Sequence, residues 1–443
     1  MKKILCLLLA LVMILGCFVG CGSKEAPAEE KKEETKTEAP AEEKKEEAKP
    51  EAPAEETKEE PVELSVILIT GYEFFEDIIR QYEAEHENVK VDVQVMPTTD
   101  YKTLIKTKFA ANDAPDIVPV FCEADYFSFY ENGYLADLSD MTDTVSRLKG
   151  GADTSFRTDD EGLIGIPYTQ EFLLCYYNKD IFAKYGLSTP DTWEQLLESC
   201  QVLKDNGVIP VGLGHKDAWV LIMMPYSVNA TTVQHADPTF YDGIPTGTNK
   251  FADNAGWQQT LNLYLDLVNT GYVNEGSLST TAEQMYEMFV NQESAMFFGG
   301  TWCDASVTAL NPEFEVGGFQ IPAPGGSKAT AASISGGMGI NGQSENMDVA
   351  KDLLAYMYSK ENLEKYGSAI ASCFTDVQTN LSTALQEGIE DAAGLPGYQY
   401  DDLNFASGVQ EVMCSSIQEM IAGIKTPVEV LEAMDAATAK ANR

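Results

Sequence analysis

From residue 62 onward, short apolar runs alternate with stretches of helical periodicity. Residues 62–70, 89–97 and 115–121 are rich in β-branched and other apolar residues, so each is expected to form a strand. Residues 74–86 carry an apolar stripe at helical spacing, and residues 101–113 are expected to form a second helix. The order strand–helix–strand–helix–strand indicates a mostly parallel sheet covered by helices.

The ends of these strands indicate where a ligand would bind. In open α/β sheets, ligands bind beyond the carboxyl ends of the strands. Here those ends lead into the loops Thr70–Glu73 and Phe121–Asp125. Both loops are therefore candidates for a binding site.

Two later helices account for two of the four tryptophans. Thr192 and Gln195 have the spacing of a capping box, which predicts a helix start beside Trp193. Trp257 lies on the apolar face of an amphipathic helix over residues 256–271. Both side chains are expected in a core, which leaves Trp219 and Trp302 without an assigned packing face.

The N-terminus has the pattern of an export signal. Two lysines precede an apolar run over residues 4–19, which suits a signal peptide and is short for a membrane span. The run ends in "LGCFVGCGS", which resembles a bacterial lipoprotein signal with Cys21 as the lipidated residue. Cys17 is the competing acceptor, and an ordinary secretory signal is the alternative. Lipid on a processed cysteine supplies more than one acyl chain, enough for stable anchoring.

Residues 21–61 contain a repeat of acidic and basic residues. The sequence "EAPAEEKKEE" begins at Glu25 and again at Glu38, and "EAPAEETKEE" begins at Glu51. Beyond alanine these residues have almost no apolar side chains with which to build a core. We expect a disordered or partly helical tether that holds the following domain away from a membrane.

Charge and motifs exclude several classes of function. A formal net charge of −40 repels phosphate backbones and argues against nucleic acid. His86, His215 and His235 show no zinc-binding spacing, and no GxSxG, P-loop or dinucleotide-binding motif is present. By count, the many acidic residues would permit a glycosidase pair. No pair stands out, so no enzyme, no metal and no cofactor are expected.

The folded part of the chain contains six cysteines, which do not form a metal-binding pattern. Most lie in apolar or helical contexts, where buried free thiols are common. An even count in an exported protein also permits disulfides. We expect few or none among Cys122, Cys175, Cys200, Cys303, Cys373 and Cys414.

Several stretches, taken together and in order, resemble a known family. They are "NDAPDIV", "IGIPYTQEFLLCYYNKDIF", "GLSTPDTWEQLL", "FVNQESAMFFGGTW" and "GGMGINGQSENMDVAKDLLAYM". This set is similar to the family 1 extracellular solute-binding proteins, the receptors of ABC sugar importers such as maltose-binding protein. The resemblance extends from Val62 to Arg443.

The resemblance implies an α/β protein with the two-lobe periplasmic-binding-protein type II fold and a ligand cleft between the lobes. Crossing hinge segments would lie at residues 166–171, at residues 333–339 and between about 380 and 390. The expected division is a signal peptide at 1–20, a tether at 21–61, a first lobe of 62–168 and 338–385, and a second lobe of 169–337 and 386–443.

In similar proteins the tryptophan of "GTW" forms an aromatic platform in the cleft, which makes Trp302 the first candidate. The apolar face of a sugar ring can stack on such a side chain, with Gly299 and Gly300 allowing the backbone close to the ligand. A buried core position is the alternative for Trp302. Glu171, at the first crossing, matches a position that contacts sugar hydroxyls, with a hinge salt bridge as its alternative. The remaining candidates are Tyr72, Glu73, Phe121, Glu123, Asp125, Asp217, Trp219, Gly336, Gly337, Tyr400 and Phe405.

These features predict a substrate-binding lipoprotein of an ABC importer. It would capture a neutral mono- or oligosaccharide by hinge closure and deliver it to the permease subunits in the membrane. We expect a monomer on the extracellular face of the cell membrane, held there by its lipid alone. The alternatives are the same fold binding a polyamine or another small solute, and a surface sensor or adhesion lipoprotein without a transport partner.

Overall fold

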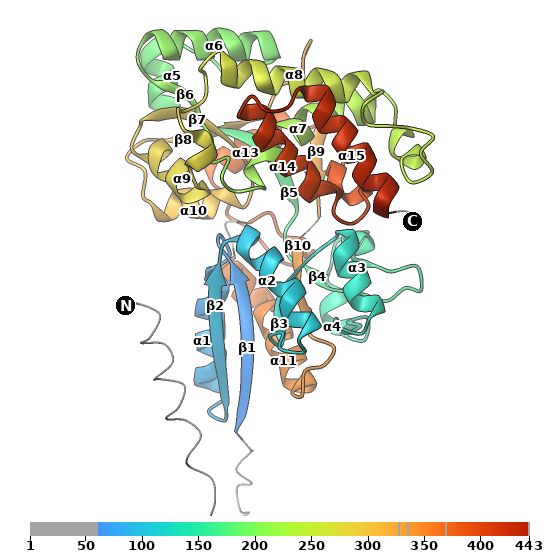
Figure 1. Cartoon of the computed structure of the whole chain (residues 1–443). Helices are drawn as coiled ribbons and strands as arrows, with labels where there is room; N and C mark the ends of the chain where they lie inside the picture. Colours follow the sequence, from blue (N-terminus) through green and yellow to red (C-terminus); the bar gives the residue numbers. More distant parts are fainter. Residues whose placement is uncertain (1–60, 327, 335, 368–369, 442–443) are drawn as a thin grey trace, which may run out of the picture. The chain divides into compact units, whose positions relative to one another are not determined.

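The first sheet arises from the strand–helix alternation at the start of the folded chain. The computed structural model describes residues 61–441, except 327, 335, 368 and 369 (Figure 1). Five strands have the order β2–β1–β3–β10–β4. β1 is parallel to β2 and β3, whereas β10 is antiparallel to β3 and β4. The strands are β1 (Val62–Ile69), β2 (Val89–Met96), β3 (Ile117–Phe121), β4 (Ile166–Pro167) and β10 (Gly336–Ile340).

Helices cover both faces of this sheet, which confirms the expected α/β architecture. α1 and α11 contact each other and lie behind the sheet in Figure 1, whereas α2 lies in front of it. Phe75, Ile78, Ile79 and Tyr82 are the buried residues of α1, as its apolar stripe predicts. The helices are α1 (Phe74–Glu85), α2 (Thr98–Ala110), α3 (Ala124–Glu131), α4 (Thr142–Val145), the 3-10 helix η1 (Thr154–Phe156), α11 (Met347–Met357) and α12 (Lys360–Lys365).

The second sheet is built around a central buried strand, β5. Its order is β11–β9–β5–β7–β6, and β8 also pairs with β5. β7, β8 and β9 are antiparallel to β5, and β6 is parallel to β7. The strands are β5 (Glu171–Asn178), β6 (Ile209–Gly212), β7 (Ser294–Gly300), β8 (Val316–Phe319), β9 (Thr330–Ser333) and β11 (Gly397–Tyr398).

One helix of the second sheet begins with the capping signal predicted from the sequence, and two predicted core tryptophans lie inside its core. Thr192 and Gln195 form the expected capping box at the start of α6, and both Trp193 and Trp257 are buried. The helices are α5 (Lys179–Tyr185), α6 (Trp193–Asp205), α7 (Val220–Asn229), α8 (Ala255–Asn269), α9 (Ala282–Val290), α10 (Cys303–Ala309), α13 (Thr383–Asp391), α14 (Val409–Ile421) and α15 (Pro427–Ala441). Short helical turns are η2 (Ala230–His235), η3 (Phe240–Gly243), η4 (Ser277–Ser279) and η5 (Asp401–Asn404).

Each sheet has its own hydrophobic core, and within the described residues the chain passes between the two cores three times. The first passage joins β4 to β5, and the second joins β9 to β10. Both fall within the segments expected from the sequence. The third lies between Val377, which packs on the first core, and Leu381, which packs on the second.

The third passage corrects one lobe boundary. The sequence assigned residues 338–385 to the first lobe, but Ala384 and Leu385 are fully buried in the second core. They belong to α13, which packs on β8 and β5. Because this helix covers the second sheet, the boundary precedes Ser382. The strand β10 likewise begins at Gly336, two residues before the expected position.

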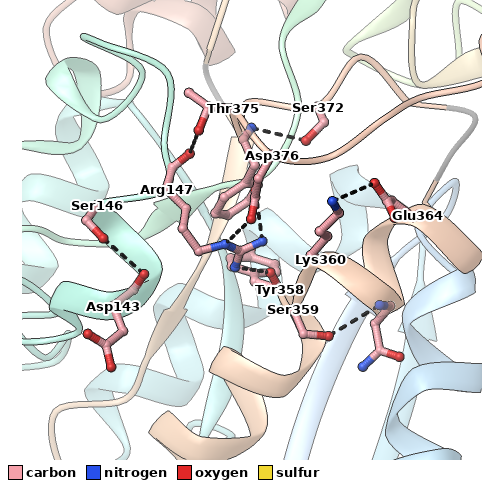
Figure 2. Close-up of polar contacts among 12 residues, drawn as sticks. Asp143, Ser146, Arg147, Tyr358, Ser359, Lys360, Glu364, Ser372, Thr375 and Asp376 are labelled. Atoms are coloured by element: carbon pink, nitrogen blue, oxygen red, sulfur yellow. Dashed lines mark hydrogen bonds and ion pairs between the residues drawn. The ribbon is translucent and has the colours of Figure 1, made fainter.

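Arg147 fixes the chain just before the third passage (Figure 2). Its guanidinium donates two hydrogen bonds to Asp376, at 2.9 and 3.2 Å, and a third to the carbonyl oxygen of Tyr358 at 2.7 Å. It also lies 4.8 Å from the ring centroid of Phe374. The nearby arginine holds the pKa of the Asp376 carboxyl below its ordinary value. A bidentate pair of this kind fixes orientation as well as distance. It therefore holds the chain at Asp376 in a defined position where the chain leaves the first core.

Some sequence-based predictions lie outside the described residues. These are the signal peptide at 1–20, lipidation of Cys21 or Cys17, and the tether at 21–61 apart from its last residue. Within the described part of the chain, no helix combines the length and apolar character that a membrane span requires. All six cysteines there are buried and have free thiols.

Candidate functional site

A cavity of about 520 Å³ lies between the two cores. Its first-core wall comes from the carboxyl end of β1, the start of α2 and the end of β3, which is the edge where parallel sheets bind ligands. Its second-core wall comes from β5, α7, α9, α14 and the segment around η5. Eight of the sequence candidates line it: Tyr72, Phe121, Glu123, Glu171, Asp217, Trp219, Trp302 and Tyr400.

Trp302 occupies the junction of the two cores. Its side chain is partly buried and packs against apolar residues of both cores. The ring of Trp219 meets it edge to face, with centroids 6.0 Å apart and an interplanar angle of 71°. Two indoles in this arrangement give the cavity a broad aromatic wall. The alternative of a fully buried core tryptophan does not describe this position.

The two glycines of "GGTW" make room for neighbouring side chains of the protein: Gly300 for Trp302 and Gly299 for Cys303. A Cβ atom on Gly300 would lie 2.1–2.5 Å from atoms of the Trp302 ring, and one on Gly299 would lie 2.7 Å from Cys303 Sγ. Neither glycine lines the cavity. The absence of a side chain at Gly300 therefore makes room for the indole against strand β7.

Replacing Gly300 with alanine tests this arrangement. The added methyl group must displace the indole of Trp302, which we expect to cost about 1–3 kcal/mol of unfolding free energy and to change the tryptophan fluorescence. Chemical unfolding and emission spectra measure the two effects. Gly397→Ala is the matched control, because its nearest neighbour would lie at 3.8 Å, an ordinary contact. Equal stability and identical spectra for both variants would contradict this role.

Glu171 and Tyr72 meet at the first passage between the cores. Glu171 is the first residue of β5 and is only 4% exposed. Burial raises the pKa of the Tyr72 hydroxyl well above its ordinary value, and the nearby Glu171 carboxylate raises it further. A Cβ on Gly336 would lie 3.1 Å from Glu171 Oε1, so this glycine leaves room for the carboxylate. The side chains can present a carboxylate and a phenol to one ligand.

Asp217 and Trp219 lie just before α7, beside the start of α9. Asp217 Oδ2 accepts a hydrogen bond of 2.7 Å from the amide of Ala282, the first residue of α9. Burial raises the pKa of this carboxyl. The next residue of α9, Glu283, also lines the cavity. This corner therefore combines an indole with two carboxylates.

The segment between β11 and α14 presents two residues to the cavity and anchors two others. Tyr400 and Asp402 line the cavity. Asp401, fully buried, accepts hydrogen bonds from the side chains of Asn229, Gln234 and Tyr241. Phe405 is also buried, among the rings of Tyr241, Phe251 and Trp257. The structure thus corrects Phe405 from a candidate ligand contact to a core residue.

Four more candidates lie outside the main cavity. Glu73 is exposed, and its carboxylate accepts a hydrogen bond of 2.8 Å from the amide of Gly71. Asp125 lines a separate cavity of about 20 Å³, and Gly336 and Gly337 line one of about 10 Å³. None of these four residues lines the main cavity in the described structure.

Comparison with known proteins places this architecture in a family. The model of the bacterial extracellular solute-binding proteins matches residues 68–364. The chain belongs to this family. This solute-binding protein is 22% identical to the multiple sugar-binding protein of Streptococcus mutans over 299 residues, covering 65% of this chain and 70% of that protein. It is 23% identical to the melibiose/raffinose/stachyose-binding protein MelE of Bacillus subtilis over 376 residues, covering 80% and 83%.

A solved structure supports the same fold. The sugar transporter protein of Bacillus licheniformis in complex with stachyose superposes with a TM-score of 0.72 at 21% identity. The match covers 86% of this solute-binding protein and all of the other chain. The two-lobe fold expected from the sequence is therefore confirmed.

Several cavity residues of this solute-binding protein were not found from the sequence. Pro97, Thr98, Thr99, Lys102 and Lys106 line the cavity because β2 ends at Met96, at the same sheet edge as β1 and β3. The rule that ligands bind beyond the carboxyl ends of strands was applied to β1 and β3 only. Applied to β2, it would have identified Pro97, Thr98 and Thr99. Residues of the second core that were also missed are Tyr286, Glu283, Asp402, Gln410 and Glu411.

The described residues of this solute-binding protein offer no metal centre. Among them, no group of three or more His, Cys, Asp or Glu side chains is placed to hold an ion. His215 is a core histidine with a tyrosine hydroxyl at 2.8 Å and a serine hydroxyl at 2.9 Å. Its burial lowers its pKa to about 3, so the imidazole is neutral at physiological pH.

Proposed function

We propose that this protein is the substrate-binding component of an ABC importer and that it captures a neutral saccharide between its two lobes. The observation that carries the proposal is the composition of the cavity wall. Trp219, Trp302 and Tyr286 supply flat apolar surface, and six carboxylates and the amide of Gln410 also line the wall. Aromatic faces suit the C–H surface of a sugar ring, and carboxylates accept hydrogen bonds from its hydroxyl groups.

The charge of the wall favours a neutral ligand over an anionic one. Six carboxylates line the cavity: Glu123, Glu171, Asp217, Glu283, Asp402 and Glu411. The cations among the described lining residues are Lys102 and Lys106, and both already pair with carboxylates. A uronate or a sugar phosphate would therefore meet net negative charge at close range.

The proposed cycle is binding followed by hinge closure. The three passages between the cores provide the hinge, and a ligand that contacts both lobes favours the closed form. We further propose a lipid on Cys21 that holds the protein on the outer face of the membrane beside a permease. Relatives named for melibiose, raffinose and stachyose make α-galactosides the first ligands to test.

A thermal-shift and calorimetric screen tests this function. The panel contains melibiose, raffinose, stachyose and maltotriose, with galacturonate and spermidine as charged comparisons. A ligand at 100 times its Kd that binds only the native state adds about 2.7 kcal/mol of stability, which is a clear shift. We expect a neutral saccharide to bind and galacturonate to fail. Binding of spermidine alone would overturn the choice of ligand and leave the fold unaffected.

A further inference from the structure

Two lysines on α2 line the cavity between the cores, and one of them, Lys106, contacts the second core's α14. Lys102 and Lys106 are four residues apart, which places them on one face of the helix, while Tyr101, Ile105 and Phe109 anchor it in the first core. Lys106 Nζ lies 2.6 Å from Asp125 Oδ2 and 2.9 Å from Glu411 Oε1. Asp125 belongs to the same lobe as the lysine, but Glu411 lies on α14 of the other.

Further hydrogen bonds join the lobes near this ion pair. Ser407, which precedes α14, donates from Oγ to Asp125 Oδ1. The same aspartate therefore contacts Lys106 of its own lobe and a hydroxyl of the other. At another point, Gln399 Nε2 donates to Ser155 Oγ at 3.1 Å. The described conformation is thus one in which the lobes hold each other through polar side chains.

At the cavity wall, Lys102 of one lobe and Asp402 of the other interact electrostatically. Lys102 pairs with Glu123 and lies 4.5 Å from the ring centroid of Phe121. Asp402, on η5 of the other lobe, is 9% exposed. Gln410 Nε2 donates to its Oδ2, while its Oδ1 has no hydrogen-bond partner among the described residues. Because Lys102 is already paired with Glu123, a negative charge on Asp402 is poorly compensated.

Asp402 meets titratable groups from several elements. Burial raises its pKa to about 8; Glu123 and Asp401 add to the rise, and Lys102 opposes it. The other groups that feel its charge are Cys122, Tyr226 of α7, Tyr241 of η3, Tyr400 and Cys414 of α14. Glu123, Lys102 and Cys122 belong to the opposite lobe. If the lobes open, these three side chains move away from the Asp402 carboxyl, which then becomes exposed to water.

We propose that Lys102, Lys106, Glu123, Asp125, Asp402 and Glu411 form an interlobe clasp that couples closure to the uptake of one proton by Asp402. This inference rests on the proposed hinge closure around a saccharide. In the open form Asp402 loses a proton near the ordinary aspartate pKa of about 4. In the closed form the carboxyl keeps its proton, because its neighbours across the interface disfavour a second negative charge. Closure is therefore favoured at low pH and loses this advantage as the pH rises through about 8.

The test uses a readout of closure that needs no saccharide. Small-angle X-ray scattering of the purified protein is compared at pH 6 and pH 9 for the wild type and Asp402→Asn. We expect the wild type to expand at pH 9 and the asparagine variant to stay compact, since the amide has no charge to bury. Equal dimensions of the wild type at both pH values, or the same expansion in Asp402→Asn, would overturn the proton coupling.

A second arm measures binding of raffinose by calorimetry. We expect its affinity for the wild type to fall about 50-fold from pH 6 to pH 8, because closure is linked to one proton whose pKa is about 8 in the closed form and about 4 in the open form. The affinity for Asp402→Asn should change little. Lys106→Met should weaken binding about two- to fivefold and reduce its salt dependence, since this lysine is partly exposed. Lys108→Met is the matched control, because Lys108 pairs with Asp113 within one lobe. Equal losses in both lysine variants would contradict the clasp.

The two arms separate this inference from the proposed function. If raffinose and the other saccharides fail to bind at every pH, the proposed function fails, and scattering still decides whether the clasp exists. If they bind with the same pH dependence in the wild type and in Asp402→Asn, the function stands and the proton coupling is wrong.

Discussion

Replacing Trp302 with alanine is expected to lower saccharide affinity at least about 30-fold, the loss typical of a buried aromatic anchor. The indole packs against both cores and meets Trp219 at 6.0 Å, so its removal opens the aromatic wall at the junction of the lobes. Because Trp302 is only partly buried, both cores should remain folded. Calorimetric titration with the saccharides of the panel measures the affinity, and circular dichroism follows the fold.

The control for Trp302→Ala is a second aromatic truncation away from the cavity. Tyr398→Ala removes a partly exposed ring that contacts His235 at the edge of the second sheet and does not line the cavity. We expect wild-type affinity in this variant. Trp302→Phe should keep part of the affinity because a smaller flat ring remains. Wild-type binding by Trp302→Ala would remove this residue from the site.

Replacing Asp401 with alanine is expected to cost about 3 kcal/mol of unfolding free energy, because each buried donor left without an acceptor costs about 1–3 kcal/mol. The change leaves Asn229 Nδ2, Gln234 Nε2 and Tyr241 Oη without the carboxylate that accepts from them at 2.6–2.9 Å. Urea unfolding measures the loss. Because Asp401 anchors the segment that carries Tyr400 and Asp402, saccharide binding should weaken as well.

The same carboxyl gives stability a pH dependence with a defined sign. Burial raises the pKa of Asp401 to about 7, while its three hydrogen-bond donors lower it. In the unfolded chain the pKa of an aspartate is about 4. Between pH 4 and pH 7 the folded state therefore binds one more proton than the unfolded state. The contribution of Asp401 to the free energy of unfolding is therefore fully present below pH 4 and is lost as the pH rises through 7. Asp401→Asn should flatten this part of the profile between pH 5 and pH 8, and an unchanged slope would contradict the assignment.

The fold could be predicted further than the site, and particular residues show why. The stripe of α1, the capping box at Thr192 and the buried Trp257 follow from local periodicity, which the sequence contains in full. The segment of Tyr400 to Phe405 has no regular period. Its short 3-10 turn sends Asp401 into the core and Asp402 to the cavity, although the two residues are adjacent and chemically identical.

The lysines of α2 show a second limit. A helical pattern identifies the apolar face that packs on the helix's own sheet. Whether the polar face meets solvent or another lobe depends on contacts such as Lys106 with Glu411, which are 305 residues apart. A local sequence pattern cannot predict a contact between residues so far apart in the chain. Of the candidates found by resemblance, Glu171 begins β5 directly after the first passage and Trp302 packs against both cores, so both lie where the lobes meet.

The position of β10 has a consequence for how the exported chain matures. This strand lies between β3 and β4, yet it comes from residues 336–340, after most of the second lobe. The first sheet therefore lacks a middle strand while the chain emerges from the membrane. During that interval the unpaired edges of β3 and β4 can form hydrogen bonds with strands of other chains. The second lobe also waits for its last part, because α13, α14 and α15 follow β10 in the chain and belong to the second core. Neither lobe can therefore be completed until the chain has almost fully emerged.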